Sequence, residues 1–349
     1  MKTIKKLTVL VLAFLMIFAM SGCSGLKIIK EVANVDGRII AEGEFRYYLE
    51  NVKTQMLTEA GLSTEEEIES FWAGDINGEN AADVAKNKAM EEVIRVEIAN
   101  ILAQEEQIAV SSETKSSYKE AIKTGNEQID QLKETTGLDD DSLLDLILKE
   151  ETARLYANYL SSVKSEDFTP AAEDVIAKYK DEYVRVKHIF LLRTQQQEEI
   201  SEEIASENTI ESAITPEDYE ASQKLLAAEV LDRAKSGENF EALIEEYNED
   251  PGATENGYTF TKNSGMVQVF EDASFALKTG EVSEIIEQPQ GWHIIKRYAL
   301  LEEGEEYTQY INEVRAEIMT GIFNSYIDSL KVNYTIEIDQ GAVKGIKIK

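Results

Sequence analysis

The stretch that decides the fold is YVRVKHIFLL, residues 183–192, where the hydrophobic pattern changes its period. Before this stretch, apolar residues recur every three or four positions, which is typical of amphipathic helices. Within it, β-branched and aromatic residues dominate, as they do in strands. The sequence therefore predicts a mainly helical chain that is interrupted near residue 182 by a region containing strands.

Downstream of this strand, short elements follow one another closely. We expect two helices separated at Ser236-Gly237, then a strand, a third helix and a last strand, over residues 225–234, 240–247, 257–261, 270–277 and 291–298. This β-α-α-β-α-β order predicts a small α+β domain of about 115 residues.

Helical patterns flank that domain on both sides. A hairpin over 31–40, turning at Asp36-Gly37, precedes mostly helical sequence from 45 to 163. A further amphipathic helix over 307–330 is followed by a short strand at 334–338. The helical character therefore resumes after the α+β region.

Composition restricts the functions that this chain can have. Its 349 residues include 35 Lys and Arg against 67 Asp and Glu, a formal charge of −32, while 43% of the residues are hydrophobic. The hydrophobic share is enough for folded cores, and the negative charge argues against nucleic-acid binding. One Cys and two His exclude disulfide frameworks, Cys-rich zinc sites and cysteine redox pairs.

One acidic segment stands out within the α+β region. Residues 198–220 hold nine Asp and Glu and no Lys or Arg. A solvated loop is the simplest interpretation, and a specific binding role is the alternative.

The N-terminus indicates the compartment. Three lysines precede an apolar run over residues 7–20, which is the pattern of a secretory signal rather than of a membrane span. Met20-Ser21-Gly22-Cys23 resembles a bacterial lipobox, which implies cleavage of a signal peptide, residues 1–22, and acylation of Cys23. The mature chain would then carry a charge of −35 and be lipid-anchored on the extracytoplasmic face of the cell membrane. An ordinary secretory signal with an incidental cysteine is the alternative.

Both histidines, His188 and His293, fall in expected strands of the α+β region. A lone His in an apolar strand is more often structural than functional. Two in one small domain, with none elsewhere, leave the structural and the functional interpretations open.

Five motifs in order resemble the parvulin family of peptidyl-prolyl isomerases over residues 182–300. They are VKHI at 186–189, AKSGENFEAL at 234–243, YNED at 247–250, MVQVFEDASFALKTGEVS at 266–283 and GWHIIK at 291–296. With the lipobox and the helical flanks, the whole chain resembles the PrsA-like foldase lipoproteins. The resemblance implies a parvulin domain at 182–300, inserted in one helical chaperone domain similar to that of trigger factor and SurA, built from 23–181 and 301–349.

The resemblance also implies roles for individual residues. His188 and His293 correspond to a buried histidine pair, and Asp250 to a residue that faces the prolyl peptide bond. Met266 and Phe270 match the floor of a proline pocket, and Tyr258 stands in place of a pocket Leu. Gln288 and Gln290 occupy positions that often hold hydroxyl residues, so we expect a different hydrogen-bond network and count Gln288 with the substrate-binding residues.

The function implied is that of a foldase that isomerises X-Pro bonds in unfolded or nascent secreted proteins, without metal or cofactor. The acidic segment predicts no preference for phosphorylated Ser-Pro or Thr-Pro.

The main alternative is a holdase whose parvulin domain only binds peptides; a solute-binding lipoprotein is a third class. A metal site at His188, Asp250 and His293 lacks support in the family pattern, and a serine hydrolase lacks the Gly-x-Ser-x-Gly elbow. The sequence leaves open whether the chain forms a homodimer.

Overall fold

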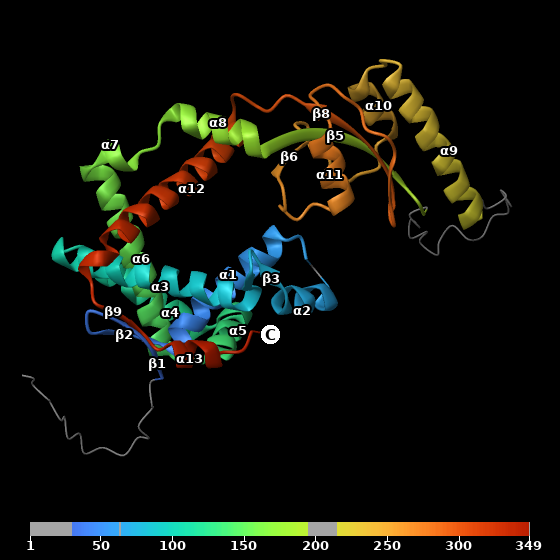
Figure 1. Ribbon diagram of the computed structural model, residues 1–349. Coiled ribbons are helices and arrows are strands. Elements are labelled where there is room, and N and C mark those ends of the chain that lie inside the picture. The colour runs from blue at the N-terminus through green and yellow to red at the C-terminus, as the bar shows by residue number, and fades with distance from the viewer. Residues whose placement is uncertain (1–29, 63, 195–214, 349) are drawn as a thin grey trace, which may run out of the picture.

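The computed structural model describes residues 30–62, 64–194 and 215–348. The predicted signal peptide, Cys23 and most of the acidic segment lie outside the described residues. Figure 1 shows three connected parts: a helical body, an arm that rises from it, and an α+β unit at the far end of the arm.

The helical body packs its helices around one hydrophobic core. Its helices are α1 (Glu42–Glu59), α2 (Glu65–Ala73), α3 (Ala81–Glu105), α4 (Ser112–Thr124), α5 (Glu127–Thr136), α6 (Asp140–Val163) and α13 (Gln340–Gly345). Helix α6 begins soon after Gly137, and the Asp139 side chain caps it by accepting a hydrogen bond from the Ser142 N–H. The long helix α3 buries the apolar face that its periodicity predicts, including Val93 and Ile98.

Two segments from opposite ends of the chain complete a small sheet in this body. Strands β1 (Glu31–Val35) and β2 (Arg38–Ala41) form the expected hairpin, and β9 (Ile336–Ile338) pairs with the other edge of β1. The pairing is antiparallel, with Val35 opposite Ile336. The body also holds a two-stranded ribbon of β3 (Asp75–Ile76) and β4 (Glu79–Asn80).

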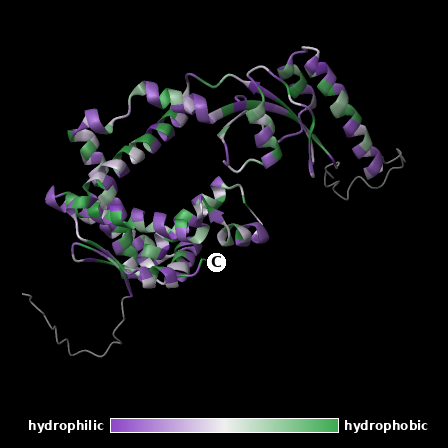
Figure 2. Ribbon diagram, viewed as in Figure 1, coloured by the Kyte–Doolittle hydropathy of each residue, from purple (hydrophilic) through white to green (hydrophobic). Residues whose placement is uncertain are grey.

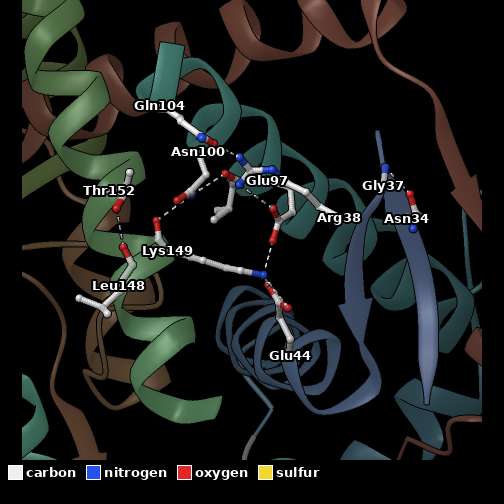
Figure 3. A network of polar contacts seen from close by, with 11 residues as sticks. Asn34, Gly37, Arg38, Glu44, Glu97, Asn100, Gln104, Leu148, Lys149 and Thr152 are labelled. Atoms are coloured by element: carbon white, nitrogen blue, oxygen red, sulfur yellow. Dashed lines mark hydrogen bonds and ion pairs between the residues drawn. The ribbon is translucent and has the colours of Figure 1, made fainter. Parts of the chain in front are cut away.

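A charged network is buried between α1, α3 and α6 (Figure 3). The Lys149 ammonium forms ion pairs with Glu44, at 2.9 Å, and with Glu97, whose side chain has no exposed surface. Arg38 lies 3.9 Å from Glu97 and donates a hydrogen bond to Gln104. Burial raises the pKa of Glu44 to about 7, against the opposing effect of Lys149. The ionisation of Glu44 in this core therefore depends on the charge of Lys149.

The arm consists of α8 (Ala172–Glu182) and the long helix α12 (Glu305–Leu330), which pack side by side. Its own small core joins Val175 and Tyr179 of α8 to Val314 of α12, and hydrophobic residues recur along α12 (Figure 2). The short helix α7 (Ser165–Phe168) precedes the arm, and η1 (Lys331–Asn333) follows it.

The α+β unit is a four-stranded antiparallel sheet with helices on both faces. Its strands, β5 (Tyr183–Leu192), β6 (Tyr258–Thr261), β7 (Ile286–Gln288) and β8 (Gly291–Tyr298), lie in the order β6-β5-β8-β7. Helices α9 (Pro216–Lys235) and α10 (Phe240–Tyr247) pack on Ile189 and Leu191. Helix α11 (Gln268–Ala276) packs with Val186 on the opposite face. Successive side chains of β5 therefore pack into two hydrophobic cores, one on each face of the sheet.

The expected α+β class is confirmed, with two differences in detail. The three-residue strand β7 was not expected. Helix α9 begins at Pro216, so residues 216–220 of the acidic segment are helical rather than loop. The reason is local, because Thr215 caps the helix, Pro216 occupies its first turn, and Glu217 and Asp218 favour its positive end. The limits of the chaperone and parvulin domains stay predictions.

Candidate active site

The two central strands of the α+β unit bring the two histidines together. His188 lies on β5 opposite Ile295 of β8, and Phe190 lies opposite His293. Since residues two apart on a strand share a face, His188, Phe190 and His293 all point toward α11. The imidazole centroids of the two histidines are 5.0 Å apart, and the Phe190 ring stacks on His293 at 4.4 Å.

A carboxylate is fixed beside this pair. His188 Nε2 lies 2.9 Å from Asp250 Oδ2, and the Tyr258 hydroxyl donates to the same oxygen at 2.6 Å. The Gly252 N–H donates to Oδ1 at 2.9 Å. Because an ionised carboxylate only accepts hydrogen bonds, this contact assigns the proton of His188 to Nε2.

The electrostatic consequences of burial differ between these groups. Burial, together with the neighbouring His188, lowers the pKa of His293 to about 4, against the opposing effect of Asp250. Burial also lowers the pKa of His188, although Asp250 opposes the shift. Burial alone would raise the pKa of Asp250, but the hydrogen bonds from Tyr258 and Gly252 and the contact with His188 bring it below its usual value. At neutral pH the site therefore holds two neutral imidazoles and one carboxylate.

An apolar cavity of about 200 Å³ opens beside the histidines. Its walls are formed by His188, Tyr258, Met266, Val267, Phe270, Gln288 and His293. The Phe270 ring meets both imidazoles nearly edge-on, at 5.4 and 5.5 Å. The cavity is therefore a small apolar pocket with neutral imidazoles on one side.

The structure brings together all the residues that the sequence assigned to this site, while Cys23, the predicted lipidation residue, lies outside the described residues. His188, Met266, Phe270, Tyr258, Gln288 and His293 line the cavity, and Asp250 contacts two of them. Gln290 does not line it and lies in the turn between β7 and β8. The roles of these residues stay predictions.

Two further residues of the site were not expected. Val267 lines the cavity and is 57% exposed, and Phe190 stacks on His293. The strand period could have identified Phe190, because it is two positions from His188 on the same face. Val267 directly follows Met266, but its exposure depends on how the loop before α11 turns.

The site offers little to a metal ion. Among residues 30–62, 64–194 and 215–348, no group of three or more His, Cys, Asp and Glu side chains is placed to hold one. His188 Nδ1 and His293 Nδ1 are buried, and neither has a hydrogen-bond partner within this part of the chain. The groups that this site presents are two imidazoles, one carboxylate and an apolar pocket.

The α+β unit and the chain around it are similar to known proteins. The model of the PPIC-type PPIase domain family matches residues 175–299. A stretch of 98 residues is 39% identical to the foldase protein PrsA of Bacillus subtilis (strain 168), covering 28% of this chain and 32% of that protein. Over 275 residues the chain is 25% identical to the foldase protein PrsA of Caldanaerobacter subterraneus subsp. tengcongensis, covering 76% and 72% of the two chains.

These matches cover different shares of the relatives' lengths. The chain spans about a third of the length of the first curated relatives that it matches. The crystal structure of foldase protein PrsA from Streptococcus pneumoniae aligns over 91% of this chain and 95% of its own, at 17% identity. Its TM-score of 0.31 is too low to compare how the parts are arranged. Residues 175–299 thus form a PPIC-type peptidyl-prolyl isomerase domain, within a chain that is similar to the PrsA foldases.

Proposed function

We propose that this chain is a lipid-anchored extracytoplasmic foldase that catalyses cis–trans isomerisation of X-Pro bonds and assists the folding of secreted proteins. The observation that carries the proposal is the apolar pocket of about 200 Å³ beside a hydrogen-bonded His188–Asp250 pair, within the matched family domain. The signal peptide (1–22), the parvulin domain (182–300) and the chaperone domain (23–181 with 301–349) are part of this proposal.

The reaction suits a site without a strong nucleophile. Rotation about a peptide bond faces a barrier of about 18–20 kcal/mol, because the planar amide is conjugated. No bond is made or broken, so catalysis requires only that the site favour the twisted amide over both planar forms. A pocket that holds the pyrrolidine ring while the preceding carbonyl turns is sufficient for this.

Different residues of the site bind the proline ring, act on the amide and position the carboxylate. Met266 and Phe270 provide apolar surface for the ring. The carboxylate of Asp250 acts electrostatically on the amide as its conjugation is lost and its charge distribution changes. His188 orients Asp250 through the Nε2 contact, and His293 packs against His188, so both histidines act mainly by positioning.

The helical body supplies the chaperone part of the proposal. A cavity of about 500 Å³ lies between α3, α6, α7 and α12, lined in part by Ala153, Ala157, Phe168, Met319 and Phe323. Apolar surface of this kind can bind exposed hydrophobic segments of unfolded chains. The partners we propose are therefore unfolded or nascent secreted proteins, with X-Pro bonds as the substrate of the isomerase site.

A protease-coupled assay on a prolyl tetrapeptide tests the enzymatic half. The chain should accelerate isomerisation above the uncatalysed rate, and His188→Ala should reduce that acceleration. If the wild-type chain matches the uncatalysed rate but still suppresses aggregation of an unfolded protein, the holdase alternative replaces the foldase.

The lipid anchor needs its own test. Among the residues that the structure describes, no helix is long and apolar enough to cross a bilayer. When expressed in a bacterium that processes lipoproteins, the chain should begin at an acylated Cys23, as shown by mass spectrometry of its N-terminal peptide. Cys23→Ala should abolish acylation. An unacylated mature N-terminus at another residue would support the ordinary secretory signal instead.

A further inference from the structure

A contact between the helical body and the α+β unit lies close to the proline pocket. The side-chain amide of Asn263, in the loop between β6 and α11, donates a hydrogen bond to the main-chain carbonyl of Glu59 near the end of α1, at 3.0 Å. The two residues are 204 positions apart. Figure 1 shows the β6–α11 loop facing this end of α1. The isomerase chemistry proposed above makes no use of this contact.

The same loop carries one wall of the pocket. Met266 and Val267 line the cavity and follow Asn263 by three and four residues. Three residues span at most about 11 Å of extended chain, so a displacement of Asn263 is transmitted to Met266 over a short path.

Asn263 is also held within its own unit, and the two surfaces lie close together around it. Its backbone N–H donates to Glu271 Oε2 at 2.8 Å, and Glu271 is buried on α11. Its φ of +59° lies in the left-handed region, which Asn tolerates better than most residues. On the body's side, a Cβ added to Gly61 would lie 3.3 Å from Gln268 Oε1, so the two surfaces approach closely here.

We propose that Asn263 is a positioning residue for the proline pocket. Through the Glu59 carbonyl, the helical body fixes the loop that presents Met266 and Val267 to the substrate. This inference rests on the proposed isomerase function. Because the pocket wall holds the proline ring in the planar and the twisted states alike, losing the contact should raise KM and leave kcat nearly unchanged.

Asn263→Asp in the full chain tests this role. The substitution keeps the side-chain size and tolerates the left-handed backbone, but a carboxylate cannot donate to the Glu59 carbonyl. We expect KM for an Ala-Pro peptide to rise about two- to tenfold, the range given by the loss of one hydrogen bond. Asn263→Gly, which also lacks the donor and accepts the backbone angle, should behave in the same way.

Matched variants separate positioning from a general loss of structure. Asn77→Asp makes the same change at another left-handed residue (φ +53°), in the turn between β3 and β4, and should leave KM unchanged. From the body's side, Gly61→Asn tolerates the φ of +66° but places a side chain against Gln268, and it should raise KM. Unchanged KM in both Asn263 variants, or a fall in melting temperature without a change in KM, would overturn the proposal.

A direct binding measurement keeps this test distinct from the test of the isomerase function. The Met266 methyl signal, followed by NMR during titration with the same peptide, gives a dissociation constant even if no turnover occurs. A larger dissociation constant in Asn263→Asp than in the wild-type chain would support the positioning role even if the isomerase proposal has failed. An unchanged constant would refute the role whether or not the wild-type chain is an active isomerase.

Discussion

His188 holds Asp250 beside the proline pocket through a 2.9 Å contact between Nε2 and Oδ2. The histidine comes from the central strand β5, and the carboxylate comes from the loop after α10, 62 positions later. A buried strand thus fixes the direction of a group on a loop, which is the usual way to position a reactive side chain precisely.

Replacing that carboxylate by an amide should reduce turnover while the fold persists. We expect Asp250→Asn to lower kcat for a prolyl peptide by about tenfold or more, because the electrostatic contribution is lost. The control is Glu255→Gln, which removes an exposed charge from the same loop and should change kcat by less than about twofold. Wild-type kcat in Asp250→Asn would show that the charge of Asp250 is not required.

Acid should destabilise the chain through His293. The native pKa of His293, about 4, lies below its unfolded value, so the unfolded state binds more protons between about pH 6.5 and pH 4. The free energy of unfolding should therefore fall as the pH is lowered through this window, by up to about 3 kcal/mol from this residue. Urea unfolding at pH 7 and pH 4.5 should show a smaller loss in His293→Phe. An equal loss in both proteins would contradict the prediction.

The buried network of the helical body predicts a large effect of one cation. Lys149→Met leaves Glu44 and Glu97 together without their shared partner, which should cost about 3–5 kcal/mol at pH 8. The cost should be smaller at pH 5, because Glu44, with a pKa of about 7, is then neutral. Urea unfolding followed by circular dichroism measures both values. As a control, Lys180→Met breaks an exposed pair with Glu302 and should cost about 0.5 kcal/mol or less.

Two glycines with positive φ should respond differently to the same substitution. A Cβ at Gly257 (φ +77°) would lie 2.3 Å from the Val186 carbonyl oxygen, so Gly257→Ala must shift the pairing of β5 with β6. We expect a loss of at least about 2 kcal/mol and a lower kcat, because Tyr258 is the next residue. At Gly237 (φ +94°) nothing lies within 4 Å, and Gly237→Ala should cost only about 1 kcal/mol of backbone strain. Similar losses in both variants would contradict this account.

Phosphorylated substrates should be disfavoured. Arg193, directly after β5, already forms ion pairs with Glu220 and Glu287, and its guanidinium lies over the Trp292 ring. A phospho-Ser-Pro peptide should therefore have a lower kcat/KM than its unmodified form, since it meets acidic neighbours rather than a free cation. A higher kcat/KM for the phosphopeptide would refute this prediction. Arg193→Gln should not change the order of the two peptides.

The parts of the fold that could be predicted are those encoded by local patterns. The change of period at residues 183–192 and the Asp36-Gly37 turn each depend on a few neighbouring residues, and both are confirmed. Thr215-Pro216 carried an equally local signal for the start of α9 that the acidic composition of the segment obscured.

The parts that could not be predicted depend on distant pairing. Strand β7 has three residues and becomes a strand only because β8 is beside it. The contact between Asn263 and Glu59 joins segments whose sequences contain no sign of each other. The site residues were accessible through family motifs, whereas the way in which Tyr258 and His188 share one oxygen of Asp250 required coordinates.

The pairing of β1 with β9 imposes an order on folding. During synthesis from the N-terminus, Val35 emerges about 300 residues before its partner Ile336, so the body's sheet stays incomplete until almost the whole chain is available. The four strands of the α+β unit all come from residues 183–298, so this sheet can assemble earlier. Until β9 arrives, one edge of β1 presents unpaired backbone groups to any extended segment nearby. A nascent copy of this chain is therefore itself vulnerable to misfolding for most of its own synthesis.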